Sequence, residues 1–138
     1  MSIKKQHLWI DRKYRRATVN IPCKVGKPAG GSSQATITNL SAGGLRITCN
    51  QETYERLLPE ELRTPGMING IPISISFAID SQDRKHPYTL TARAQIIHSE
   101  RLAQDTYHVG VQFEELEQTD DSRLAAYIDM ALAEEGQT

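Results

Sequence analysis

The nine residues IPISISFAI, at positions 71–79, place a large apolar side chain at every second position. Successive side chains of a β-strand point to opposite faces, so this period of two predicts a strand with one face in a hydrophobic core. Pro72 lacks an amide hydrogen and therefore suits the opening or the edge of a sheet. No other stretch of the sequence signals a strand as strongly.

Weaker alternation of the same kind lies on both sides of this strand. Apolar and polar residues alternate over 17–25, 35–39, 45–49, 90–96 and 107–113. The second of these stretches puts Ala35, Ile37 and Asn39 on one predicted face. Turn-forming residues, GKPAGGSS and DSQDRKHP, separate two pairs of strands. Six short strands without βαβ alternation predict a small antiparallel β-barrel or sandwich and argue against a Rossmann-type site.

Two segments depart from the strand period and favour helices. Residues 51–62, QETYERLLPEEL, are rich in helix formers, and Pro59 is expected to end or interrupt the helix there. At the other end, 120–135 begins with residues suited to capping a helix N-terminus. Its apolar residues form one stripe, which predicts an amphipathic helix docked by one face: Leu124, Ile128, Ala131 and Leu132.

The composition is that of an ordinary globular domain. The chain has 138 residues, of which 38% are hydrophobic, and this length predicts a single domain. No stretch approaches the roughly 20 apolar residues of a membrane span, and the N-terminus lacks the apolar core of a secretory signal. We therefore expect a cytoplasmic protein that does not insert into a membrane. Neither the two cysteines nor the four histidines show metal-ligand spacing, and no acid, base or nucleophile set indicates an enzyme.

Charge is distributed unevenly along the chain. Residues 1–30 carry eight lysines and arginines against one aspartate, whereas 111–138 carry eight carboxylates against one arginine. The overall net charge is −1 and the aromatic content is 6%. These values argue against a protein that binds nucleic-acid polymers, which needs a broad basic face or aromatic stacking platforms. A small anionic ligand at the basic end of the chain fits the distribution better.

Two short motifs supply the groups that such a ligand needs. The first is DRKYRR at 11–16, in which Arg12 and Arg16 offer planar guanidinium forks. A guanidinium can pair with phosphate oxygens or with the O6 and N7 atoms of guanine. The second is NLSAGGLRI at 39–47. Asn39 and Ser41 are two residues apart, which predicts a common face at a strand end, and the two glycines permit close approach of a ligand to the backbone.

Together these motifs resemble those of the PilZ domain family, the bacterial receptors for cyclic di-GMP. Arg12 to Arg16 fits RxxxR, and Asn39 to Gly44 fits [DN]xSxxG, with one strand and a loop between them. The resemblance implies a mainly β fold, a six-stranded antiparallel PilZ-type barrel with a C-terminal helix. It implies one PilZ domain over 1–138: a flexible basic arm at 1–16, a barrel at 17–113 and a helix at 120–135. A helical insertion at about 51–66 departs from the usual layout of the family.

The resemblance also implies a function and a set of site residues. Cyclic di-GMP would be bound by Arg12, Arg16, Asn39, Ser41 and Gly44, with Arg15 and Gly43 in supporting roles. The arginine arm would become ordered on the ligand and create a surface for an effector protein that the sequence does not identify. The alternative is a ligand-independent PilZ-like adaptor that acts through protein contacts. No catalytic residue, metal or cofactor is expected in either case.

Overall fold

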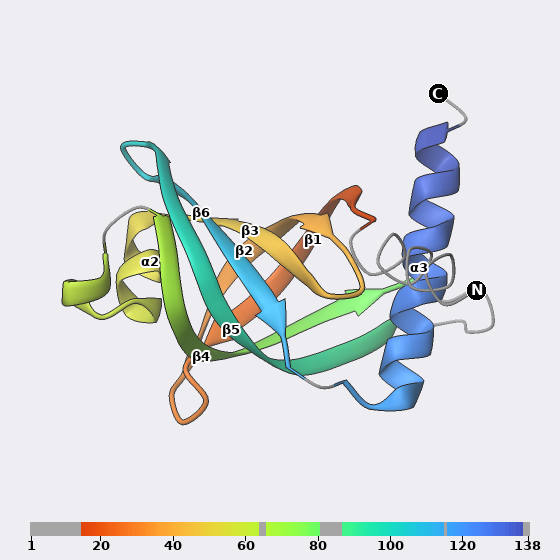
Figure 1. Ribbon diagram of the computed structural model, residues 1–138, viewed down its shortest axis with the longest axis horizontal. Helices are drawn as coiled ribbons and strands as arrows, with labels where there is room; N and C mark the ends of the chain where they lie inside the picture. Colours follow the sequence, from red (N-terminus) through yellow and green to blue (C-terminus); the bar gives the residue numbers. More distant parts are fainter. Residues whose placement is uncertain (1–14, 64–65, 81–86, 115, 137–138) are drawn as a thin grey trace, which may run out of the picture.

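The computed structural model describes residues 15–63, 66–80, 87–114 and 116–136. Within these residues six strands close a barrel in the order β1-β2-β3-β6-β5-β4, and every pair of neighbours is antiparallel. The strands are β1 (Ala17–Gly26), β2 (Ser32–Leu40), β3 (Gly44–Cys49), β4 (Gly66–Ile79), β5 (Tyr88–Ala103) and β6 (Thr106–Phe113). The expected six-stranded antiparallel fold is confirmed, and closure decides for a barrel over a sandwich (Figure 1).

The barrel interior is filled by the alternating apolar residues of the strands. In β4, Ile73, Ile75 and Phe77 are buried as predicted. The strand begins five residues before the alternation, at Gly66. Pro72 pairs with Gln95 of β5, but β1 pairs with β4 only over Ser74–Phe77. On its β1 side Pro72 therefore lies beyond the ladder, an edge position that suits a residue without an amide hydrogen.

A register shift in β2 changes which residues face the interior. Ala35 and Ile37 are buried as expected, but the pairing with β3 shifts between Ile37 and Asn39. A bulge of this kind adds a residue to one strand and reverses the alternation after it. Leu40 is consequently the buried residue, and Asn39 is partly exposed. The predicted common face of Ala35, Ile37 and Asn39 is thus wrong at its third position.

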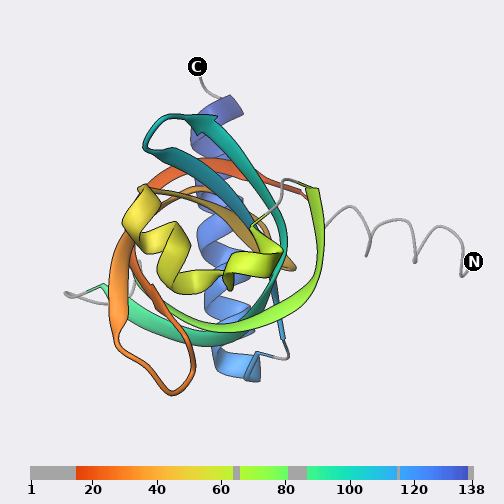
Figure 2. The same ribbon diagram turned by 90° about the vertical axis from the view of Figure 1, so that its left-hand side faces the viewer.

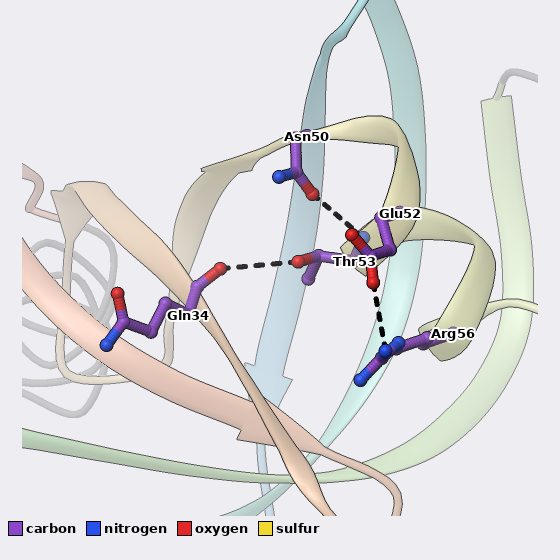
Figure 3. Close-up of polar contacts among 5 residues, drawn as sticks. All are labelled: Gln34, Asn50, Glu52, Thr53 and Arg56. Carbon is purple, nitrogen blue, oxygen red and sulfur yellow. Dashed lines mark hydrogen bonds and ion pairs between the residues drawn. The ribbon is translucent and has the colours of Figure 1, made fainter.

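Helix α2 (Gln51–Leu57) lies across one open end of the barrel (Figure 2). Asn50 caps it, since its Oδ1 accepts a hydrogen bond of 2.9 Å from the amide of Thr53. The Thr53 hydroxyl donates in turn to the carbonyl of Gln34 on β2 at 3.4 Å, and both contacts are drawn in Figure 3. Tyr54 and Leu57 are buried against the barrel. The expected interruption at Pro59 is found, where a short 3-10 helix, η1 (Glu60–Leu62), follows.

Helix α3 (Gln118–Gly136) lies at the opposite end of the barrel (Figure 1). It begins two residues before the predicted capping residues. Leu124 and Ile128 of the predicted stripe are buried, and Ala131 and Leu132 pack against the core while partly exposed. Farther along, the Glu135 carboxylate accepts a 2.6 Å hydrogen bond from the backbone amide of Thr18, which ties the helix to the start of β1.

Docking of α3 should depend on Leu124, which is fully buried. We expect Leu124→Ala to lower the free energy of unfolding by about 2–5 kcal/mol, because it removes buried methyl groups and leaves a cavity. Leu102→Ala is the matched control, since this leucine is 49% exposed and the change should cost within about 0.5 kcal/mol. Urea denaturation measures both values, and equal losses would contradict the docking of α3 described above.

Candidate functional site

Five positions form a row across the outer wall of the barrel. Thr18 pairs with Asn39, Asn39 with Arg46, Arg46 with Gly110, and Gly110 with His98. The row therefore crosses β1, β2, β3, β6 and β5 in the order in which they neighbour one another. Their sequence neighbours Leu45 and Val111 are buried, whereas the members of the row are exposed or partly exposed. Residues remote in sequence are thus gathered on one face.

A pocket of about 260 Å³ lies along this row. Its polar walls are Arg16, Asn39, Arg46 and His98, and the backbone of Gly110 opens into it. The Arg16 Nη1 atom donates a hydrogen bond of 3.2 Å to Asn39 Oδ1. This contact joins the last residue of the RxxxR motif to the first residue of the [DN]xSxxG motif. The antiparallel pairing of β1 with β2 brings the two together.

Of the other two arginines of the first motif, Arg15 lies within the described residues. Arg12 lies outside the described residues. Arg15 is exposed, and its Nη1 atom is 4.0 Å from the Oδ1 atom of Asp129 on α3. It does not line the pocket that Arg16 lines. The two neighbouring arginines therefore reach different parts of the molecule.

Ser41, Gly43 and Gly44 form the turn between β2 and β3. The Ser41 hydroxyl accepts from the amide of Gly44 at 3.2 Å and donates to its carbonyl at 3.1 Å. Ser41 is only 1% exposed, so it does not share the partly exposed face of Asn39 that the sequence predicted. The carbonyl of Gly43 accepts from the amide of Phe113 at 3.0 Å. Contact of these three residues with a ligand stays a prediction, whereas their part in closing the turn is visible.

Gly44 has no room for a side chain. A Cβ atom at this position would lie 2.1 Å from the carbonyl oxygen of Val111 on β6. Strand β3 therefore approaches β6 more closely here than any other residue type would allow. This close approach of β3 to β6 explains the glycine at position 44, independently of any ligand.

Sequence reasoning missed Arg46 and His98 as members of the site. Arg46 is exposed on β3. Burial, and next the charge of Arg46, lower the pKa of His108, while Glu100 acts in the opposite direction. The positive charge of Arg46 thus acts across the outer face of β6. Arg46 could have been recognised from the sequence, because it lies in the second motif at an exposed position of the apolar–polar alternation. Nothing in the sequence indicated that His98 lines the same pocket.

The cysteines and histidines of the described residues form no metal site. Cys23 and Cys49 are buried in the barrel. Burial is the main reason that the pKa of Cys23 rises to about 12 and that of Cys49 to about 11. Both thiols are therefore protonated at neutral pH and are poor nucleophiles. None of the helices within the described ranges is long and apolar enough to span a membrane.

Comparison with known proteins agrees with this architecture. The family model described as PilZ domain matches residues 10–130. The chain belongs to the PilZ domain family. This match includes all of the first motif, all of the second motif and most of α3. No curated protein matches the chain.

Several solved structures share the fold at low sequence identity. The PilZ domain of YcgR from Escherichia coli, solved with c-di-GMP, has 18% identity and a TM-score of 0.59, over 88% of this chain and 92% of that one. MotI/DgrA of Bacillus subtilis has 12% identity and a TM-score of 0.61, with coverage of 86% and 49%. PlzA of Borreliella burgdorferi, in complex with c-di-GMP, has 10% identity and a TM-score of 0.57, with coverage of 96% and 57%. The PilZ chain spans about half the length of the last two.

Substitution of Gly44 should destabilise the protein even without ligand. We expect Gly44→Ala to lower the free energy of unfolding by more than about 2 kcal/mol, because the new methyl group would meet the Val111 carbonyl. Gly31→Ala is the matched control, since nothing lies within 4 Å of a Cβ at that position. Thermal melting of both variants without nucleotide measures the difference, and an unaltered Gly44→Ala melting curve would disprove the steric account.

The two thiols should resist modification in the folded protein. At pH 8 a thiol whose pKa is about 11 or 12 is almost entirely protonated, and both side chains are buried. We expect slow reaction with Ellman's reagent in buffer and fast release of two equivalents in guanidinium chloride. Rapid labelling of the folded protein would contradict the burial of Cys23 and Cys49.

Proposed function

We propose that this PilZ domain is a cyclic di-GMP receptor whose ligand binds on the outer face of the barrel, at the pocket shared by Arg16 and Asn39. The observation that carries the proposal is the hydrogen bond between these two side chains. It couples the two motifs at one surface pocket, where a guanidinium and an amide are both accessible. Family membership and relatives solved with c-di-GMP support the choice of ligand.

The chemistry of the two side chains suits a ligand with phosphates and guanine edges. Arg16 presents a planar fork that can pair with phosphate oxygens or with guanine O6 and N7. Asn39 holds one nitrogen of that fork through its Oδ1, which leaves its own amide group to donate to the ligand. Arg12, outside the described residues, is proposed to complete the clasp from the other end of the RxxxR motif. Ser41 and Gly44 are proposed to contribute on the barrel side of the ligand.

The proposal includes a switch in the N-terminal arm. Ordering of residues 11–16 on the ligand would cost on the order of 6–12 kcal/mol of backbone entropy. Each hydrogen bond to a charged group contributes about 1.5–3 kcal/mol of binding free energy. Several arginine contacts are therefore needed to offset the entropy lost on ordering the arm. The ordered arm and the ligand would then form a new surface for an effector protein, which the chain does not identify. Loss of either motif arginine should remove most of the binding.

The proposed receptor acts without catalysis, as a single PilZ domain in the cytoplasm. Arg15 would assist through its charge alone, because its guanidinium is directed to Asp129 of α3. The adaptor alternative is favoured by one observation, the exposed leucines Leu62 of η1 and Leu102 of β5. It needs no ligand, so a binding measurement separates the two functions.

Isothermal titration calorimetry with cyclic di-GMP tests the receptor function. We expect saturable binding by the parent protein, with GTP giving none. Arg16→Ala should weaken the affinity by about tenfold to a hundredfold, the value of one or two charge-assisted hydrogen bonds. The matched control is Arg15→Ala, which removes the same charge one residue away and should change the affinity by less than about threefold.

The two arginine variants give distinct outcomes. Equal losses in both would indicate that the arm contributes only charge, and would contradict the Arg16–Asn39 clasp. No binding by the parent protein at high micromolar cyclic di-GMP would refute the receptor and leave the adaptor as the better account. The number of ligands bound per chain follows from the same titration.

A further inference from the structure

A second pocket lies at the α2 end of the barrel, away from both motifs. Its volume is about 300 Å³, and it is lined by Tyr54, Glu55, Arg63, Arg101 and Tyr107. These residues come from α2, from the segment after η1 and from the β5–β6 hairpin near its tip, at the end of the barrel opposite to α3 (Figure 1). None of them belongs to either motif or lines the pocket on the outer face.

The base of this pocket is a fixed aromatic pair. The rings of Tyr54 and Tyr107 are stacked, with centroids 4.0 Å apart and an angle of 10° between their planes. Tyr54 is buried, and its hydroxyl shares a 3.2 Å hydrogen bond with the buried hydroxyl of Ser99. The Asp105 carboxylate accepts a 2.8 Å hydrogen bond from the amide of Gln51, which ties the hairpin to the start of α2. The pocket is therefore formed before any partner binds, and this lowers the ordering cost of binding.

Two guanidinium groups at this pocket are held by neutral carbonyls. Arg63 donates from Nε to the carbonyl of Leu58 at 2.9 Å and from Nη2 to that of Glu55 at 3.0 Å. Arg101 donates from the same two atoms to carbonyls of the β5–β6 turn, both at 3.0 Å. The ion pairs among the described residues include neither arginine. Both forks are thus fixed in position, and their charge is available to a carboxylate from outside the chain.

Exposed leucines flank the two arginines. Leu62 directly precedes Arg63 and is 40% exposed, and Leu102 directly follows Arg101 and is 49% exposed. Tyrosine and arginine are enriched among the residues that contribute most of the free energy of protein–protein binding, and the contacts around them exclude water. Covering the leucines with a partner would also remove apolar surface from water. The pocket and its margin therefore suit a protein better than a small ligand.

The surrounding charges define the partner further. Glu55 lines the pocket, and its carboxylate accepts a 3.0 Å hydrogen bond from Gln51, one helical turn before it. Glu60 and Glu61 of η1 are exposed within three residues of Arg63. These carboxylates would repel a nucleic-acid backbone or a run of acidic residues. A single carboxylate between apolar side chains meets less repulsion and still reaches the arginines.

We propose that this pocket docks a segment of a partner protein in which one aspartate or glutamate lies between apolar side chains. The carboxylate pairs with Arg63 and Arg101, and its apolar neighbours cover Leu62 and Leu102. Planar guanidinium forks favour carboxylates in such pairs. The proposal goes beyond the receptor function and does not rest on it, because the docking residues lie outside both motifs. A receptor and an adaptor could each use this surface to bind a partner.

Selection of random peptides displayed on phage against the immobilised full chain tests the docking site. We expect the selected sequences to share one acidic residue flanked by apolar residues. A synthetic peptide of that sequence should bind the parent protein. Its counterpart with the matching amide, asparagine or glutamine, in place of the acidic residue should bind about tenfold more weakly, the value of one charge-assisted hydrogen bond. Calorimetry measures both affinities.

Matched variants locate the peptide on the protein. Arg101→Ala should weaken peptide binding by about tenfold. Arg93→Ala removes an exposed arginine of the same strand that does not line the pocket, and should change the affinity by less than about twofold. Leu62→Ala and Leu102→Ala should each weaken binding by about threefold, because less apolar surface is covered. Melting temperatures show whether each variant is folded, so a binding loss with an unchanged melting curve is assigned to the pocket.

The outcomes separate this proposal from the receptor function. A library that yields no binding peptide, or selected peptides that bind Arg101→Ala as well as the parent protein, would overturn the docking site. Equal affinities of the acidic peptide and its amide counterpart would overturn the pairing with the arginines. Arg16→Ala should bind the peptide with the affinity of the parent protein. Failure of cyclic di-GMP to bind would therefore leave the docking site standing, and loss of the docking site would leave the receptor standing.

Discussion

The antiparallel ladder that closes the barrel is the constraint on which the rest of this structure depends. Strand β1 pairs with β2 along its length, and the C-terminal part of β1 pairs with β4. The sheet is therefore closed and β1 is not an edge strand. Once the registers are set, every outward position acquires fixed neighbours on the adjacent strands. The row from Thr18 to His98 is a direct result of these registers. A shift of one residue in any of them would turn site side chains into the core.

Two local features adjust this ladder at the second motif. The bulge after Ile37 turns Asn39 outward to Arg16 while Leu40 fills the core. The turn that follows is closed by the hydroxyl of Ser41, and Gly44 then allows β3 to approach β6. The residues of the second motif therefore have different structural roles. Asn39 faces the pocket, whereas Ser41 and Gly44 hold the strands that carry it.

The uneven charge of the sequence also has a structural counterpart. The acidic helix α3 lies beside the start of β1, where Glu135 accepts from the Thr18 amide and Asp129 is close to Arg15. The first of these contacts is short and involves the backbone. The second joins exposed groups at 4.0 Å and contributes little. The backbone contact thus holds the start of β1 against the acidic helix, while the nearby Arg16 is directed to the barrel face by its hydrogen bond to Asn39.

The sequence by itself determined the six strands, the two helical segments and the family, because strict alternation and two ordered motifs are local patterns. It also identified Arg16 and Asn39, which carry those motifs. Only the tertiary structure decided that Asn39 faces outward, because a bulge leaves the residue pattern unchanged while it reverses the side chains. The burial of Ser41 was decided there too, because its hydroxyl bonds to Gly44 in the turn that follows the strand. The same holds for Arg46, Gly110 and His98, which are as many as 64 residues apart in the sequence. Strand pairing makes them neighbours, and pairing between distant strands leaves no signature in the spacing of the residues that it joins.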